Sequence, residues 1–188
     1  MKPILMALLA LCISVPLHAE TMGDDGLHKA DWMRETFKDL NEDLADANAE
    51  GKRLMVIVEQ RGCIYCAKMH KEVFPREDIS SYIRENFFVV QMNLHGDTEM
   101  TDLDGEVLTE KKAARKWGLL FTPSILFLPE EVEEDQSAQA AAVALMPGAF
   151  SAGTTLDMLT WVNEKRYALE SDEDFQRYHA RRIRERGQ

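Results

Sequence analysis

Two cysteines three positions apart, Cys63 and Cys66, stand where an apolar, strand-like run at residues 54–58 gives way to a helix-like stretch. The amide groups of a helix N-terminus stabilise a thiolate at the first cysteine of such a pair, so the placement favours thiol–disulfide exchange. We expect Cys63 to be the nucleophile, with a pKa below the free value of about 8.5, and Arg61 to add positive potential beside it. Cys66, one turn further on, is expected to be less exposed and to act as the resolving thiol.

The first 19 residues predict a secretory signal peptide. Lys2 precedes an almost wholly apolar run at residues 4–15, and Ala19 supplies a small residue at a plausible cleavage position. The apolar run is shorter than the roughly 20 residues of a membrane-spanning helix, so we expect a periplasmic protein with no stable membrane anchor. The third cysteine, Cys12, belongs to the removed segment on this interpretation.

The composition limits the partners and the role of the remaining cysteine pair. The chain of 188 residues has a formal net charge of -11, which disfavours nonspecific binding to nucleic acid. A disulfide that closes so short a loop constrains the unfolded chain little, so the pair is more suited to redox cycling than to structural support. Five arginines near the C-terminus are expected to solvate a terminal helix and to complement its dipole.

Hydrophobic periodicity predicts alternating helices and strands. Helices are expected at about residues 31–48, 63–73, 109–117 and 154–167 and near the C-terminus, and strands at about 53–59, 87–94, 124–128 and 140–146. Two β-α units followed by a hairpin give an α/β fold with a central mixed four-stranded sheet flanked by helices. The expected organisation is a signal peptide (1–19), an N-terminal helical extension (20–51), the α/β domain (52–168) and a C-terminal helix (169–188).

Between residues 52 and 167 the chain resembles the thioredoxin superfamily. The resemblance rests on the strand–CxxC–helix unit, on Thr122-Pro123 before a later strand, and on a closing hairpin and helix. It implies a thioredoxin-like fold and a thiol–disulfide oxidoreductase in which the cysteines carry the electrons and no bound cofactor is required. It also implies a cis Thr122–Pro123 bond beside the CxxC, with the Thr122 backbone free to pair with an extended substrate, whereas X-Pro bonds in general are cis in only about 5–6% of cases.

A finer resemblance concerns the periplasmic SoxW-type, thioredoxin-related proteins. The active-site run at residues 59–70, EQRGCIYCAKMH, is similar, and so are the MPGAF turn at residues 146–150 and the ending around Phe175 and Tyr178. This resemblance implies a protein or sulfur-carrier disulfide as substrate, in sulfur oxidation, and a membrane thiol transporter as electron donor.

Ile64 and Tyr65 lie between the two cysteines and are expected to contact substrates and to tune the reduction potential. Neither carries the ionisable imidazole that strongly oxidising relatives place there, which favours a reductant. A disulfide oxidase or isomerase remains an alternative, because about 30 mV, equivalent to 1.4 kcal/mol, is enough to shift the direction of electron flow.

Two positions depart from ordinary thioredoxin. Gly62 replaces the tryptophan that commonly precedes the CxxC, and Ile57 occupies the position of its buried aspartate. Glu59 is the nearby acidic candidate for proton transfer to Cys66, and the alternative is an ordinary glutamate at a strand end.

Metal binding is the main competing hypothesis, since cysteine and methionine are ligands that suit Cu(I). The candidate ligands for such a metal-delivery protein are Cys63, Cys66, Met69, His70, Met92, His95 and Met100. We expect Met69 to face the core, however, and His70 to face solvent or to pack against its helix, and we expect no metal site. A noncatalytic protein that only shares the fold is a third class, which the presence of both cysteines disfavours.

Overall fold

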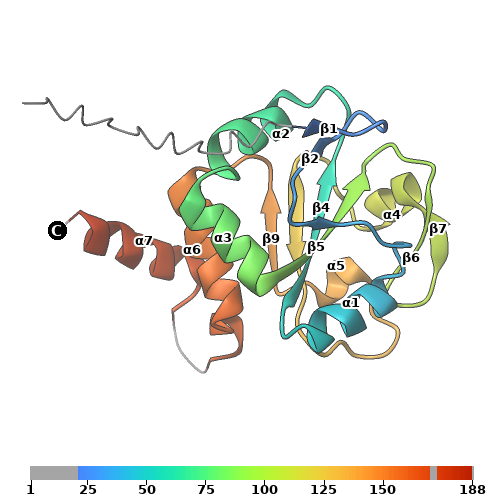
Figure 1. Ribbon diagram of the computed structural model, residues 1–188. Coiled ribbons are helices and arrows are strands. Elements are labelled where there is room, and N and C mark those ends of the chain that lie inside the picture. The colour runs from blue at the N-terminus through green and yellow to red at the C-terminus, as the bar shows by residue number, and fades with distance from the viewer. Residues whose placement is uncertain (1–20, 170–172, 188) are drawn as a thin grey trace, which may run out of the picture.

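A computed structural model describes residues 21–169 and 173–187, and its central element is a five-stranded mixed sheet with helices on both faces (Figure 1). The strands are β1 (Thr21–Met22), β2 (His28–Lys29), β3 (Met33–Arg34), β4 (Arg53–Glu59), β5 (Phe87–Asn93), β6 (Glu99–Thr101), β7 (Val107–Thr109), β8 (Ser124–Phe127) and β9 (Ala144–Pro147). The helices are α1 (Leu40–Ala49), α2 (Ile64–Lys68), α3 (Glu77–Asn86), α4 (Glu110–Lys116), α5 (Ala138–Ala141), α6 (Ala152–Asn163) and α7 (Phe175–Arg186). A π-helical turn, Met69–Val73, continues α2, and a 3-10 turn, Arg166–Ala168, follows α6.

The strand order of the sheet is β3-β5-β4-β8-β9. β4 runs parallel to β5 and antiparallel to β8, and β8 and β9 form an antiparallel pair. The predicted mixed sheet and its four strands are therefore confirmed. The two-residue strand β3 adds a fifth strand, parallel to β5 at the edge.

The predicted N-terminal helix is wrong in its first half, because α1 begins only at Leu40. Met33 pairs with Val89 in the sheet, and Phe37 is exposed. Lys38 has a positive φ of 58°, which ends any helical path, and the Asp39 side chain then caps α1. The prediction failed because the helical spacing of apolar residues continues through Lys38, where the backbone breaks the helix.

The connection between β8 and β9 also differs from the prediction. The expected strand at 140–146 begins only at Ala144, because residues 138–141 form the short helix α5. The Ser137 side chain accepts a hydrogen bond from the amide of Ala140, and the alanines that follow favour helix.

Two hydrophobic clusters lie on the two faces of the sheet, and alternate residues of β4 contribute to each. Met55 and Ile57 belong to the cluster beneath α3 and α6, and Val56 and Val58 belong to the one beneath α1 and α4. Figure 1 shows these helix pairs on opposite sides of the strands. No described helix is both long enough and apolar enough to span a membrane, and the predicted signal peptide lies outside the described residues.

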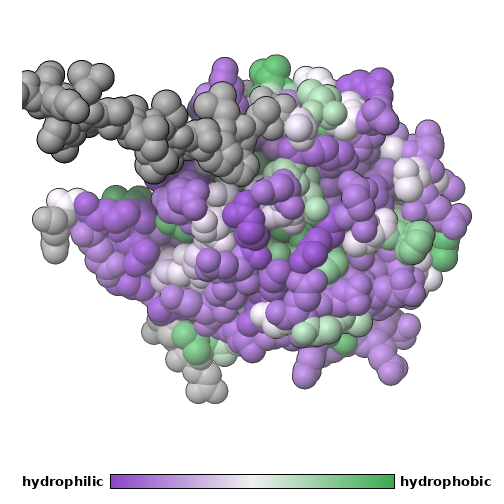
Figure 2. Space-filling view, in the orientation of Figure 1, coloured by the Kyte–Doolittle hydropathy of each residue, from purple (hydrophilic) through white to green (hydrophobic). Residues whose placement is uncertain are grey.

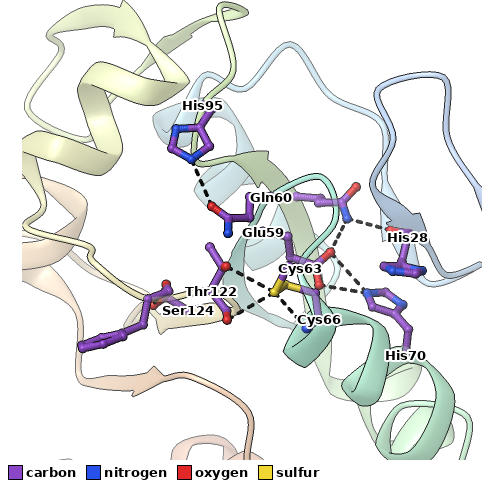
Figure 3. Close-up of a disulfide and its surroundings, with 11 residues drawn as sticks. His28, Glu59, Gln60, Cys63, Cys66, His70, His95, Thr122 and Ser124 are labelled. Atoms are coloured by element: carbon purple, nitrogen blue, oxygen red, sulfur yellow. Dashed lines mark hydrogen bonds and ion pairs between the residues drawn. A yellow bond between two sulfur atoms is a disulfide. The ribbon is translucent and has the colours of Figure 1, made fainter.

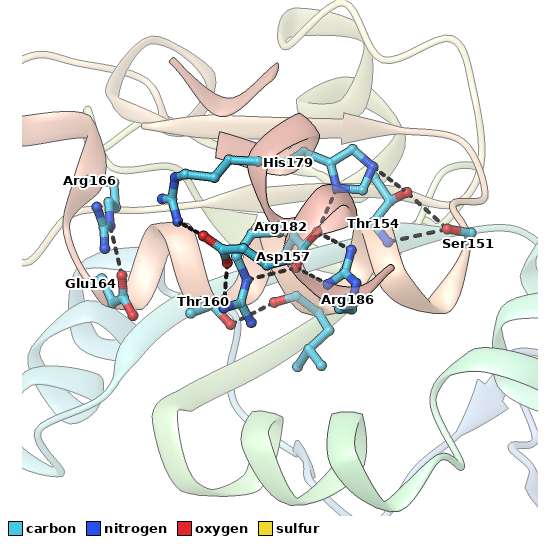
Figure 4. Close-up of polar contacts among 12 residues, drawn as sticks. Ser151, Thr154, Asp157, Thr160, Glu164, Arg166, His179, Arg182 and Arg186 are labelled. Atoms are coloured by element: carbon cyan, nitrogen blue, oxygen red, sulfur yellow. Dashed lines mark hydrogen bonds and ion pairs between the residues drawn. The ribbon is translucent and has the colours of Figure 1, made fainter. Parts of the chain in front are cut away.

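The predicted C-terminal helix is present as α7. The buried carboxylate of Asp157, in α6, binds side chains of this helix (Figure 4). Asp157 accepts hydrogen bonds from both terminal nitrogens of Arg186, at 2.6 and 2.8 Å, and lies 2.6 Å from Nδ1 of His179. Burial alone would raise the pKa of Asp157, but the hydrogen bonds from Arg186 and His179 hold it below its usual value. The C-terminal arginines therefore partly attach the helix to the body rather than only solvating it.

Candidate active site

The two cysteines lie where the end of β4 turns into α2, and they form a disulfide with their Cα atoms 5.2 Å apart (Figure 3). Cys63 is the N-cap residue of α2, and its Sγ accepts a hydrogen bond from the amide of Cys66 at 3.0 Å. Cys63 is 7% exposed and Cys66 is fully buried. Cys66 is therefore less exposed than Cys63, as predicted, and the order in which the two thiols react stays a prediction.

The loop before β8 supplies a second contact to the Cys63 sulfur. The Thr122–Pro123 bond is cis, as the resemblance implies, and Thr122 lies against the cysteine although 59 residues separate the two. The Thr122 hydroxyl donates to Cys63 Sγ at 3.3 Å, and the Thr122 carbonyl oxygen lies 3.4 Å from the same sulfur. A Cys63 thiolate in this position would keep two hydrogen-bond donors, the Cys66 amide and the Thr122 hydroxyl.

Gly62 stands immediately before the cysteine pair with a φ of +72°. This left-handed conformation strains a residue with a Cβ, so a tryptophan, as in ordinary thioredoxin, does not suit this turn. The backbone conformation therefore gives a physical reason why glycine replaces tryptophan before the cysteine pair.

Behind the disulfide, the Glu59 carboxylate is 1% exposed and takes part in a buried polar network. Nε2 of His70 lies 3.1 and 3.2 Å from its two oxygens, and Nε2 of Gln91 donates to it at 2.6 Å. Glu59 is thus buried at the strand end, with at least one hydrogen-bond partner at each of its two carboxylate oxygens. Of the two arrangements expected for His70, the structure excludes the one that faces solvent, since its side chain is only 3% exposed. The ring packs instead beside Phe74, at the end of its own helical run, and is stacked on His28.

The N-terminal segment, residues 25–29, covers this network on its outer side. Gln91 donates to the backbone oxygen of His28 at 2.7 Å and accepts from the Lys29 ammonium at 2.7 Å. The same ammonium binds Asp25, whose burial opposes ionisation but whose pKa is still lowered by the Lys29 hydrogen bond. Arg61 donates a hydrogen bond to the Asp25 carbonyl oxygen at 3.2 Å, so its guanidinium binds this segment, and its effect on the Cys63 sulfur stays a prediction.

Exposed apolar side chains flank the cysteine pair. Ile64 and Tyr65 are 74% and 58% exposed, and Leu120 and Phe121, which precede Thr122, are 80% and 62% exposed. The two segments meet at the contact between Thr122 and Cys63. Elsewhere, on the face shown in Figure 2, hydrophilic side chains predominate and hydrophobic ones form small separate areas.

The ligand set of the copper hypothesis does not converge. Met69 lies in the core cluster on one face of the sheet, whereas Met92 and Met100 lie in the cluster on the other face. His70 is bound to Glu59, and Nε2 of His95 lies 3.0 Å from Oε1 of Gln60. Within the described part of the chain, no group of three or more His, Cys, Asp or Glu side chains could hold a metal ion.

Comparison with known proteins agrees with this geometry. A family model described as "Thioredoxin-like domain" matches residues 40–160, which is more than half of the chain. The chain belongs to the thioredoxin-like family. Because this family model and the CxxC occur together, we describe it as a thioredoxin-like protein of the oxidoreductase type.

Two solved structures show the same fold. A thioredoxin-fold protein from Helicobacter pylori is 17% identical, with a TM-score of 0.58, and the match covers 73% of this chain and 85% of that one. A thioredoxin from Thermus thermophilus is 22% identical, with a TM-score of 0.51, and the match covers 66% of this chain and 83% of that one. No curated protein sequence matches significantly.

Sequence reasoning missed the partners of Glu59 and the apolar residues before Thr122. His70 follows Cys66 by four positions, so a shared buried helix face was a signal that pointed to the network. Gln91 and the residues of β2 gave no such signal, because only the folded chain brings them to Glu59.

Proposed function

We propose that this thioredoxin-like protein is a periplasmic thiol–disulfide oxidoreductase that reduces disulfides of proteins or sulfur carriers. The observation that carries the proposal is the setting of the Cys63 sulfur, which receives hydrogen bonds from the Cys66 amide and the Thr122 hydroxyl. Donors aimed at one sulfur favour its thiolate, the form that attacks disulfides. The second sulfur, on Cys66, is buried and already within bonding distance of the first.

The reaction proceeds in two exchanges. The Cys63 thiolate attacks one sulfur of the substrate disulfide, the substrate S–S bond breaks, and the departing thiolate takes a proton. The Cys66 thiolate then attacks Cys63 Sγ, which forms the internal disulfide and releases the second substrate thiol. Two electrons have passed to the substrate, and an external dithiol must reduce the protein disulfide before the next cycle.

The substrate is proposed to lie across the apolar surface beside the cysteines. Ile64 and Tyr65 from one segment and Leu120 and Phe121 from the other would cover the residues that flank its disulfide. The backbone of Thr122, ahead of Pro123, would pair with an extended stretch of the same substrate.

The finer assignment rests on the similarity to SoxW-type proteins. It makes a sulfur-oxidation carrier protein the candidate substrate and a membrane thiol transporter the candidate donor. Reduction is the proposed direction, because neither Ile64 nor Tyr65 places an imidazole between the two cysteines. A reduction potential near roughly -270 mV would agree with this direction, and one of roughly -120 to -180 mV would instead indicate an oxidase or isomerase.

A trapping experiment tests the exchange mechanism. In the variant Cys66→Ser the second exchange is impossible, so mixed disulfides with peptide or protein substrates should accumulate through Cys63. Their yield is measured by mass spectrometry after acid quenching and alkylation. The matched control Cys63→Ser should trap at least about tenfold less, because its remaining thiol is buried. Equal trapping by both variants, or none by either, contradicts the proposal.

A further inference from the structure

A cavity of about 690 Å³ opens beside the buried network, between the N-terminal segment and the helical run that follows the cysteines. Trp32 and Phe74 supply apolar walls, and His70 also lines it. Lys71 and Glu77 on its border are exposed, so the cavity communicates with solvent. It is large enough for many water molecules, since one water occupies about 30 Å³.

His70 separates this cavity from Glu59. Its Nε2 contacts the Glu59 carboxylate at 3.1 and 3.2 Å. Its other ring nitrogen, Nδ1, has no hydrogen-bond partner within the described residues. The two nitrogens of the ring can therefore serve two different environments, a buried carboxylate and cavity water.

Glu59 in turn lies next to the cysteine pair. Figure 3 draws its carboxylate between the disulfide and the His70 ring. Independently of that view, Cys66 and His70 are four positions apart on one continuous helical run, and both are buried. Side chains at this spacing are neighbours on a helix, so Cys66 and the His70 ring that contacts the carboxylate lie on one face of this run.

We infer that His70 is a positioning and proton-relay residue that connects cavity water, through Glu59, to the buried Cys66 sulfur. The inference rests on the proposed function, because it concerns the protonation of Cys66 in the exchange reaction. When the protein disulfide is reduced, Cys66 leaves as a thiolate and needs one proton. One proton enters the imidazole at Nδ1 from water, one passes from Nε2 to Glu59, and Glu59 protonates the Cys66 thiolate.

The reverse sequence removes the proton when Cys66 becomes the attacking thiolate. The Cys66 thiol gives its proton to Glu59, which passes it to Nε2 of His70 as the ring releases another from Nδ1 to the cavity. Each step moves a single proton and leaves the electron count of the cysteines unchanged. The relay explains how a fully buried thiol exchanges protons without direct contact with solvent.

The groups around Glu59 and His70 favour proton transfer toward the cavity. The Gln91 amide occupies Oε2 of Glu59, and β2 covers the network with the His28 ring and the Lys29 ammonium. His28 and Lys29 are the titratable groups of β2 that face Glu59 and His70.

Charged groups from other elements line the cavity itself. They are Asp31, Lys71, Glu77 and Arg84, of which Arg84 and Asp31 form an ion pair at 2.9 Å. The pH dependence of the relay therefore belongs to the network as a whole.

Single-turnover kinetics test the inference in full-length mature protein. The reduced protein is mixed with a peptide disulfide, and the lifetime of the mixed disulfide is followed by rapid quenching between pH 5.5 and 8.5. We expect His70→Gln and Glu59→Gln each to slow the release step about tenfold or more and to change its pH profile. Formation of the mixed disulfide by Cys63 should stay within twofold of wild type, and so should both steps in the control His95→Gln.

Chemical rescue separates proton transfer from packing. In His70→Gly, added imidazole should enter through the cavity and restore most of the release rate. Pyrazole has the same shape but is a far weaker base, so it should fill the same space without restoring the rate. Equal rescue by both compounds would show that the ring only fills space, and would overturn the relay.

The outcomes distinguish the relay from the function on which it rests. If wild-type protein fails to form a reversible internal disulfide, the proposed function fails. If wild type cycles normally but His70→Gln and Glu59→Gln release substrate within twofold of it at every pH, the relay alone is wrong. Glu59→Gln leaves His70 in place, so it still decides the question if His70→Gly does not fold.

Discussion

At the scale of single residues, the reactivity of Cys63 depends on which donors reach its sulfur. The amide of Cys66 is one donor, and backbone geometry fixes it wherever α2 forms. The Thr122 hydroxyl is the other, and it comes from a loop 59 residues away. Because a side chain supplies it, it is the contact that a substitution can remove without altering the CxxC itself.

Removing that hydroxyl tests its contribution. In Thr122→Val, the Cys63 thiolate loses one hydrogen bond, worth about 1 kcal/mol, so its population near neutral pH should fall about fivefold. The rate of alkylation by iodoacetamide at pH 6, measured on the reduced protein with Cys66 counted separately by mass, should fall by the same factor. Thr122→Ser keeps the hydroxyl and should react like wild type. If valine and serine react alike, the hydroxyl has no influence on the sulfur.

At the scale of elements, the sequence predicted best where one local signal decides the structure. The strand at residues 53–59 and the helix after Cys63 were predicted closely, because their apolar runs are unambiguous. The start of α1 was not, because helical spacing of apolar residues does not reveal a left-handed residue such as Lys38. The short helix α5 depends on an N-cap at Ser137, which was overlooked when the alanines after it were predicted to form a strand.

Helix α1 also contains a buried acid that is expected to cost stability. Asp43 is 3% exposed, and burial, followed by the charges of Asp39 and Asp46, raises the pKa of its carboxyl to about 6, although the Thr36 hydroxyl opposes the shift. Because the pKa in the folded state lies above the ordinary value of 3.8, the folded state binds the proton more tightly. The contribution of this residue to stability is therefore most favourable below about pH 4, and it is lost as the pH rises through about 6.

The variant Asp43→Asn should remove this pH-dependent cost. Urea denaturation should show a free energy of unfolding about 1 to 3 kcal/mol higher than wild type at pH 7.5, with the difference shrinking toward zero near pH 4. The exposed Asp46→Asn on the same helix serves as the control and should change stability by less than about 0.5 kcal/mol. A variant Asp43→Asn that is less stable than wild type at pH 7.5 would mean that the carboxylate is needed in its ionised form.

At the scale of the whole molecule, the candidate site combines parts of very different predictability. Cys63, Cys66 and the cis bond at Pro123 were predicted, the cysteines from their spacing and the proline from a family resemblance. The environment of Glu59 was not, because Gln91 reaches it from a neighbouring strand and β2 reaches it from the start of the chain. Long-range polar contacts leave no periodic pattern in a single sequence, so only the fold reveals them.

The proposed substrate surface likewise depends on a long-range contact, because two segments far apart in the sequence form it together. If Leu120 and Phe121 contact protein substrates, the double variant Leu120→Ser/Phe121→Ser should lose about 1 to 2 kcal/mol of binding. The second-order rate with a folded protein disulfide should then fall about tenfold, while the rate with hydroxyethyl disulfide, which is too small to cover both side chains, stays within twofold. Val107→Ser, in β7, removes a side chain of similar exposure, 58%, outside both segments and should leave both rates unchanged. Equal losses on the two substrates would place the defect at the cysteines and not at a binding surface, because only a binding surface distinguishes a protein from a small disulfide.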